Sequence, residues 1–274
     1  MNAMRLTSSA PSLRQHTITA PAPAWRHPDH IVLETCVEDI EGVRISARAG
    51  ADRAELCDNL TAAGTTPSIG TIEAAIFAAA EQVEQRRAQA GPYWADKADA
   101  AAPFGLRVII RPRGGSFVYD ADEGRAMIAD VRRIASLALE MAEFTRPQAT
   151  GGGRGQLPPA VDLGFVVGAL TEDGTIDRGL VRLLVDMANG APVTFHRAFD
   201  QCRDTVEAYG DLEGLGVRYV LTSGAAQTAA DGASVIAGLV ASGGPTVVAA
   251  GAVRPHGLVD LVESTGVREV HMRC

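Results

Sequence analysis

Gly50-Ala-Asp-Arg-Ala-Glu-Leu-Cys57 is the stretch of sequence that decides the fold, because its form recurs twice further along the chain. The related stretches are Gly216-Val-Arg-Tyr-Val-Leu-Thr222 and Gly266-Val-Arg-Glu-Val-His271. In each, a helical pattern ends at glycine, two or three polar or small residues follow, and a short apolar run begins. Glycine can adopt the left-handed conformation that ends a helix, and β-branched residues favour a strand. The repeated unit is therefore predicted to be helix, cap, strand.

Eight short apolar runs along the chain are predicted strands, with helical patterns between them. They are Ile31–Cys36, Arg53–Cys57, Leu106–Arg111, Val161–Val167, Val193–His196, Tyr219–Thr222, Thr246–Ala249 and Glu269–His271. Eight such units in about 240 residues are close to the ~250 residues of a closed eight-stranded barrel. The pattern therefore predicts an α/β fold, a (β/α)8 TIM-type barrel, rather than an open doubly wound sheet. Because the sequence stops at Cys274, soon after the eighth strand, we expect the eighth helix to be missing or replaced.

Three segments do not fit the repeat. Residues 1–30 carry arginines, Ser, Thr and Pro, and we expect a disordered or loosely attached N-terminal extension, with a transit peptide as the alternative. Residues 31–274 are then a single TIM-barrel domain. Arg86–Pro103 and Glu143–Pro159 are expected to be insertions in loops that lead into strands.

Composition limits the possible partners. Lys and Arg number 25 against 33 Asp and Glu, a net charge of −8, so neither nucleic acid nor an anionic membrane surface is expected as a partner. The sequence has no run of eighteen apolar residues and no secretory signal pattern, which predicts a cytoplasmic protein. Its four cysteines form no C-x-x-C pattern, so a disulfide framework is not expected.

Polar residues at the carboxyl ends of the strands are the candidates for function, because active sites of such barrels lie there. The first two strands end in Glu34-Thr35-Cys36 and Glu55-Leu56-Cys57. Each pair of Glu and Cys is two residues apart and therefore on one face of its strand. Adjacent strands would bring the two pairs together, although Cys36 and Cys57 are alternatively small buried core residues.

The third strand leads into a loop that is suited to an anion. Arg111 and Arg113 supply forked donors, and Gly114-Gly115 exposes backbone N–H groups. The alternative is that these arginines form salt bridges with Glu34 or Glu55 inside the barrel.

The later strands add further candidates. His196, with Asp200 nearby after the fifth strand, is a candidate general base or metal ligand. Small residues after the sixth and seventh strands, with one arginine, are a candidate anion cradle; they are Ser223, Gly224, Gly251 and Arg254. His271 ends the eighth strand, and alternation alone does not decide whether it points into the site.

The same segments resemble the CutC family of copper homeostasis proteins. The matching strings include LETCVEDIEG, GADRAELCDNL, VIIRPRGGSFVYD, PVTFHRAFDQCRD and GAVRP, in consistent order from about Ile31 to His271. The resemblance implies a TIM-type barrel, a cytoplasmic location, self-association into a homo-oligomer and a role in copper handling. For copper, it points to Cys36 and Cys57.

Two hypotheses about function follow, and the sequence leaves open whether the protein is an enzyme. In the first, Cys36 and Cys57 bind Cu(I), a soft cation that prefers thiolates, as a near-linear pair. In the second, a barrel enzyme acts on a small anionic molecule that bears phosphate or carboxylate. Its catalytic residues would be Glu34, Glu55, Arg111, His196 and Asp200, and its anion-binding residues Arg111, Arg113, Arg254, Ser223, Gly224 and Gly251. A binding or scaffold barrel without catalysis is a third possibility.

Overall fold

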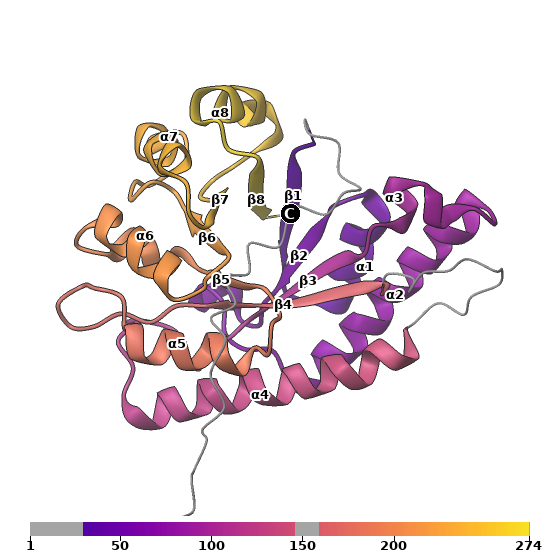
Figure 1. The fold of residues 1–274 in the computed structure, drawn as a ribbon, viewed down its shortest axis with the longest axis horizontal. Coiled ribbons are helices and arrows are strands. Elements are labelled where there is room, and N and C mark those ends of the chain that lie inside the picture. Colours follow the sequence, from indigo (N-terminus) through magenta and orange to yellow (C-terminus); the bar gives the residue numbers. More distant parts are fainter. Residues whose placement is uncertain (1–29, 146–158, 274) are drawn as a thin grey trace, which may run out of the picture.

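Eight parallel strands close into a barrel in which each strand lies beside the next one in the sequence and β8 pairs with β1 (Figure 1). The computed structural model describes residues 30–145 and 159–273. The strands are β1 (Val32–Val37), β2 (Arg53–Leu56), β3 (Phe104–Ile109), β4 (Val161–Val167), β5 (Val193–Phe195), β6 (Tyr219–Thr222), β7 (Thr246–Ala249) and β8 (Glu269–Arg273). The predicted TIM-type barrel is confirmed, and each strand lies within about two residues of its predicted position.

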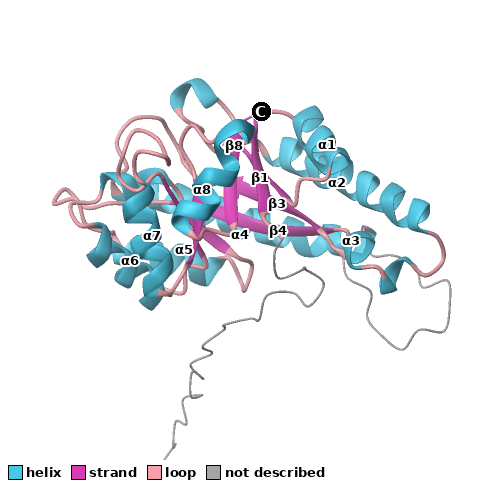
Figure 2. Cartoon of the chain, turned by 90° about the horizontal axis from the view of Figure 1, so that it is seen from above, coloured by secondary structure: helices cyan, strands magenta, loops and turns pink. Residues whose placement is uncertain are grey.

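Helices surround the strands on the outside of the barrel (Figure 2). They are α1 (Ile40–Ala49), α2 (Ile69–Ala90), α3 (Ala98–Ala101), α4 (Ala121–Phe144), α5 (Arg178–Met187), α6 (Thr205–Gly214), α7 (Ala233–Ser242) and α8 (Leu258–Thr265). β8 ends at Arg273, the last described residue, so the expected absence or replacement of a helix after this strand stays a prediction. None of the helices among the described residues combines the length and hydrophobicity needed to cross a membrane.

The repeated glycine at the end of each helical pattern has the predicted conformation. Gly50, Gly216 and Gly266 have φ angles of 90°, 80° and 70°, in the left-handed region. Gly50 ends α1, Gly266 ends α8, and each leads within three residues into the next strand. The signal that predicted the fold is therefore a real helix stop.

One predicted loop insertion is wrong in part. Within Arg86–Pro103, the helix α2 continues to Ala90 and the short helix α3 precedes β3. The segment 81–90 consists almost entirely of strong helix formers, which carries the helix outward past the sheet. Arg87 anchors its end, since the buried guanidinium lies 4.3 Å from the centre of the Trp94 ring. The other predicted insertion and the N-terminal extension lie largely outside the described residues.

The barrel interior has a charged layer near the amino ends of the strands. Arg53 and Arg107 are 2% exposed and point inward from β2 and β3. The register places Gly105 opposite Arg53 and Gly164 opposite Arg107. A Cβ at Gly105 would lie 2.4 Å from Cγ of Arg53, and one at Gly164 would lie 2.9 Å from Cδ of Arg107. Each glycine therefore leaves the space that an arginine occupies.

Above this layer the interior becomes apolar. Buried side chains from five different strands or strand ends pack together here; they are Cys57, Ile109, Val166, Tyr219, Leu221, Val248 and Ala250. Cys57 belongs to this group, so the apolar layer reaches the carboxyl ends of the strands, where the candidate residues lie.

The fit between arginine and glycine can be tested by Gly105→Ala. The added Cβ has to displace the Arg53 side chain in a closed layer, and overpacking of this kind costs about 1–3 kcal/mol. Chemical denaturation followed by circular dichroism measures the loss. Gly238→Ala is the matched control, because a Cβ there meets nothing within 4 Å and helix propensity favours alanine. Equal stability of the two variants would contradict the packing described here.

Candidate metal centre

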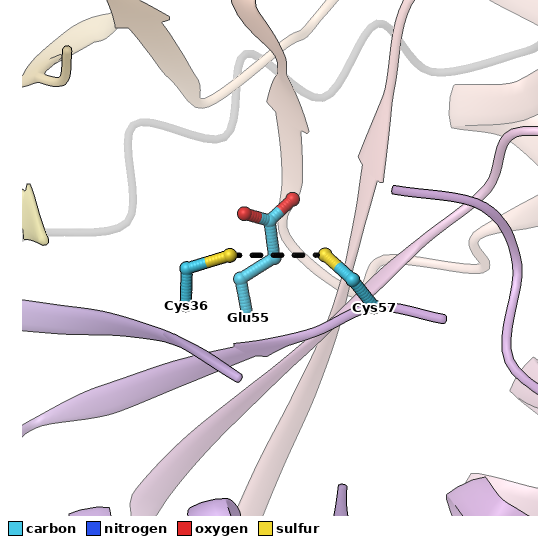
Figure 3. A group of neighbouring side chains, drawn as sticks. All are labelled: Cys36, Glu55 and Cys57. Carbon is cyan, nitrogen blue, oxygen red and sulfur yellow. Dashed lines mark hydrogen bonds between the residues drawn. The ribbon is translucent and has the colours of Figure 1, made fainter. Parts of the chain in front are cut away.

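Two cysteine sulfurs meet at the carboxyl ends of β1 and β2. The distance between Sγ of Cys36 and Sγ of Cys57 is 4.0 Å (Figure 3). Cys57 is 2% exposed within the apolar layer, whereas Cys36 is only partly buried. The predicted convergence of the two Glu-x-Cys strand ends is present, and the pair is reached from the side of Cys36.

The third member of the group is Glu55, which lies between the two sulfurs in Figure 3. The β1–β2 register pairs Cys36 directly with Glu55, and Cys57 follows two residues later. The three ligand atoms of Cys36, Glu55 and Cys57 lie within 4.8 Å of one another. This is a compact set of two thiols and one carboxylate.

The spacing of the two thiols suits a bridging metal ion. With metal–sulfur bonds of about 2.3 Å, two thiolates on one ion are about 3.8 Å apart in a tetrahedral site and about 4.6 Å apart in a linear one. The separation of 4.0 Å between Cys36 and Cys57 falls within this range. The residues therefore fit a metal held by both sulfurs with only small rotations of the side chains.

The same register disfavours a disulfide. Because Cys57 lies two residues beyond the partner of Cys36, a rise of about 3.3 Å per residue and a strand spacing of about 4.8 Å separate their Cα atoms by about 8 Å. A disulfide requires a Cα separation below about 7 Å. In Figure 3 the sulfurs point toward one another from opposite sides, as expected for residues held apart by their backbones.

A second cluster of ligand atoms adjoins the thiols. Nδ1 of His271, on β8, donates to Oε1 of Glu34 at 2.8 Å, and its Nε2 lies 3.6 Å from Oε2 of Glu55. Oε2 of Glu34 accepts from Nε of Arg53 at 2.7 Å, and Arg53 also pairs with Glu269 at 2.6 Å. The charged layer of the barrel thus positions His271 beside Glu55.

These contacts set the protonation of the carboxyl groups. Burial alone would raise the pKa of Glu34, but the charge of Arg53 and the hydrogen bond from His271 outweigh it and bring the pKa to about 2. Burial raises the pKa of Glu55 to about 8, helped by the negative charges of Cys36 and Glu34. Hydrogen bonds to Cys36 and Glu34 raise the pKa of His271 well above its ordinary value, against the effect of burial.

The two thiols interact, and their pKa values move in opposite directions. The hydrogen bond with Cys57 lowers the pKa of Cys36, and the same bond together with burial raises the pKa of Cys57. The partly accessible Cys36 is therefore the more acidic of the two thiols. Since thiolates rather than thiols ligate metals, Cys36 is the better placed of the two to meet an incoming soft cation.

The arginines of the loop after β3 hold the backbone of that region. Arg111 donates to the carbonyl oxygens of Ala62, Gly64 and Gly115 at 2.7–2.9 Å, and its guanidinium lies 4.9 Å from the centre of the Phe117 ring. The alternative prediction that Arg111 pairs with Glu34 or Glu55 is wrong, because its donors bind loop carbonyls.

The other predicted arginines likewise lie away from these carboxylates. Arg113 pairs with Glu123 and donates to the carbonyl oxygens of Ser116 and Val118, so it does not pair with Glu34 or Glu55 either. Arg254 is exposed and donates to the carbonyl oxygen of Val253.

His196 and Asp200 form a separate part of the rim. Nδ1 of His196 accepts from the backbone N–H of Ala198 at 3.1 Å, and burial together with the charge of Arg111 lowers the pKa of His196 to about 3. Asp200 accepts hydrogen bonds from Thr222 and Ser223 and pairs with Arg197. No hydrogen bond or ion pair in the described chain connects His196 or Asp200 with the two cysteines.

The small residues predicted as an anion cradle lie beside Asp200. Gly224 and Gly251 have φ angles of 71° and 102°, and a Cβ at Gly251 would lie 2.9 Å from Cβ of Ser223. The loops after β6 and β7 therefore pack closely, and glycine is required for both turns.

Sequence reasoning missed Arg53 and Glu269 and left His271 undecided. A signal was present, because Arg53, Glu55 and Cys57 alternate along one face of β2, and Glu269 and His271 do so on β8. Alternation gives the shared face, but the pairing of Arg53 with Glu34 across strands depends on the barrel register.

The fold and the centre define a class, the TIM-type barrels with a thiol, carboxylate and imidazole group at the carboxyl ends of the strands. The family model described as the CutC family matches residues 31–142 and 160–274. The chain therefore belongs to the CutC family.

Its relatives include a CutC family protein of Mesorhizobium japonicum and the human copper homeostasis protein cutC homolog. Both are 34% identical to this chain over 242 residues, which is 88% of this chain and 76% and 72% of the two relatives. The solved structure of CutC from Streptococcus agalactiae is 28% identical, with a TM-score of 0.66, covering 88% of this chain and 98% of its own. The similarity thus spans nearly the whole described barrel.

The separation of the two cysteine backbones predicts resistance to oxidation. Treatment of the metal-free protein with diamide should leave Cys36 and Cys57 without an intrachain disulfide, as measured by mass spectrometry of non-reduced peptides. The positive control is the double variant Glu55→Cys, Cys57→Ser, which places the second thiol directly opposite Cys36. A linked 36–57 peptide from most of the natural protein would contradict the register argument.

The ion pair of Glu34 predicts a pH dependence of stability. A carboxyl with a lower pKa in the folded than in the unfolded chain stabilises the fold above its unfolded pKa and loses this contribution as the pH falls toward its folded pKa. At pH 6 the natural protein should exceed Glu34→Gln by about 3–5 kcal/mol, the usual effect of breaking a buried pair.

That difference should shrink between about pH 5 and pH 2, because the folded pKa is about 2. Urea denaturation of both proteins across this range measures it. A difference independent of pH would show that Glu34 is not ionised in the folded protein.

Proposed function

We propose that this protein binds Cu(I) through Cys36 and Cys57 and takes part in copper homeostasis. The observation that carries the proposal is the pair of sulfurs 4.0 Å apart on two neighbouring strand ends. Cu(I) is soft and prefers thiolate ligands, and few protein groups other than a thiol pair suit it. The human relative bears the name copper homeostasis protein, which agrees with this chemistry.

The surroundings of the pair disfavour a hard cation. Cys57 packs with Ile109, Val166 and Leu221, which keep water from one side of the sulfurs. A hard cation would lose its hydration shell there without sufficient oxygen ligands in return. Cu(I) held by two thiolates needs no such ligands.

Copper can enter and leave at Cys36, which is partly exposed. Cys36 would bind the ion first as a thiolate, and Cys57 would then release its proton to solvent and bind the same ion. The nearby imidazolium of His271 offsets the negative charge that two thiolates leave around a monovalent ion. The centre can thus bind copper and remain accessible to a partner thiol.

The alternative, an enzyme acting on a small anionic molecule, has less support. Arg111 and Arg113 would bind the anion, but the described contacts direct their guanidinium groups to loop carbonyls and to Glu123. Within the anion-binding set, Arg254 is exposed and has a single backbone bond. Catalysis by Glu34, Glu55, His196 and Asp200 stays a prediction.

A cytoplasmic location and self-association also stay predictions. The copper proposal requires Cys36 and Cys57 in the reduced state, which suits a reducing compartment. Exposed apolar side chains on neighbouring helices, Ile45 of α1 at 47% and Phe77 of α2 at 49%, are candidates for contact with a second copy.

Substitution of the thiols tests the copper proposal. Cys36→Ser and Cys57→Ser should each lower the affinity for Cu(I) by more than the roughly 10–100-fold that loss of an outer-shell partner costs. Competition with bathocuproine disulfonate under anaerobic, reducing conditions measures the affinity. Cys202→Ser is the matched control, because Cys202 follows β5 and contacts Ala198 instead. Unchanged affinity in the double variant of Cys36 and Cys57 would disprove the proposal.

A further inference from the structure

Copper binding by two thiolates leaves one member of the centre without a role. Glu55 lies between the sulfurs, is 5% exposed and has its carboxylate within 4.8 Å of both Sγ atoms. A Cu(I) ion held by a thiol pair gains little from a hard carboxylate oxygen. The position of Glu55 therefore calls for a different explanation.

The contacts of Glu55 leave its carboxyl group free of a short ion pair among the described residues. Nε2 of His271 lies 3.6 Å from Oε2, which is too long for a good hydrogen bond. The guanidinium of Arg53 pairs with Glu34 and Glu269 instead. The carboxyl group of Glu55 is therefore not held by a strong partner and can turn onto a metal ion beside the two sulfurs.

We propose that Glu55 completes a three-ligand site with Cys36 and Cys57 that binds Zn²⁺ and leaves a fourth coordination position open. The inference uses the two thiols of the proposed copper site and adds a ligand and a second class of metal. Zn²⁺ accepts thiolate sulfur at about 2.3 Å and carboxylate oxygen at about 2.0–2.2 Å in tetrahedral geometry. Three protein ligands with one open position are typical of zinc sites that exchange a water or a small ligand.

The geometry requires only small movements. Tetrahedral zinc would place two sulfurs about 3.8 Å apart, against the 4.0 Å between Cys36 and Cys57. The register holds Glu55 directly opposite Cys36, so the carboxylate approaches the ion from the strand between the two thiols. Glu55 is then the residue that determines specificity, because it adds an oxygen ligand that a divalent ion uses and Cu(I) does not.

A supporting network orients that ligand. His271 donates from Nδ1 to Glu34, so its ring is held with Nε2 toward Glu55. Glu34 is fixed in turn by Arg53. Metal ligands are commonly positioned by such outer partners, whose loss typically costs 10–100-fold in affinity.

Cobalt provides the first test, as a spectroscopic substitute for zinc. The full-length, reduced, metal-free protein is titrated with Co²⁺ under anaerobic conditions. We expect near-ultraviolet sulfur-to-cobalt charge transfer together with intense visible bands of four-coordinate cobalt, both abolished by one equivalent of Zn²⁺. Weak bands of six-coordinate cobalt without charge transfer would overturn the inference.

The second test separates Glu55 from the thiols. Glu55→Gln should lower the affinity for Zn²⁺ by roughly tenfold or more and change that for Cu(I) by less than about threefold. Glu73→Gln, an exposed change on α2, should leave both affinities unaltered. An equal loss of both metals in Glu55→Gln would mean that Glu55 only supports the fold of the centre.

A measurement on the natural protein keeps the inference testable if Glu55→Gln fails to fold. Zinc K-edge X-ray absorption of the zinc-loaded protein should show two sulfurs at about 2.3 Å and two oxygen or nitrogen neighbours at about 2.0–2.2 Å. A shell without sulfur, or with four sulfurs, would contradict the site. Cobalt–thiolate bands without Cu(I) binding would refute the copper proposal alone, and Cu(I) binding without these bands would refute the zinc inference alone.

Discussion

The parallel register of β1 against β2 is the constraint on which the centre depends. It places Cys36 opposite Glu55 and carries Cys57 two residues further, so that two thiols and a carboxylate converge while the two cysteine backbones stay apart. A slip of one residue would turn every side chain of β2 to the other face of the sheet. The same pairing that closes the barrel thus sets the distance between the sulfurs and disfavours their oxidation to a disulfide.

Beneath the centre, a layer of buried charge connects the strands. Arg53 joins Glu34 on β1 to Glu269 on β8, and His271 joins Glu34 to the region of Glu55. Replacement of such a buried network by apolar residues is often neutral or stabilising, so stability alone does not explain it. Its evident effect is to hold one imidazole and one carboxylate in defined positions beside the thiols, with Gly105 leaving space for the arginine.

Much of this arrangement follows from the sequence, and the remainder does not for identifiable reasons. The helix, glycine, strand repeat gave the barrel, and the alternation in Glu34–Cys36 and Glu55–Cys57 gave the convergence of the centre. The partners of Arg53 depend on the barrel register, which no local pattern encodes. Arg111 was predicted to face an anion or an internal carboxylate, yet it binds three carbonyl groups of neighbouring loops, which sequence does not bring together. The extension of α2 was missed because charge and alanine suggested a loop.

The central claim is that the sulfurs of Cys36 and Cys57 hold one metal ion between them. Anomalous diffraction at the copper edge, from crystals of the Cu(I)-loaded protein, tests it most directly. We expect a single peak between the two Sγ atoms at the carboxyl ends of β1 and β2, with the backbone of both strands unmoved. A peak bound elsewhere on the chain, with the two thiols unligated, would contradict it.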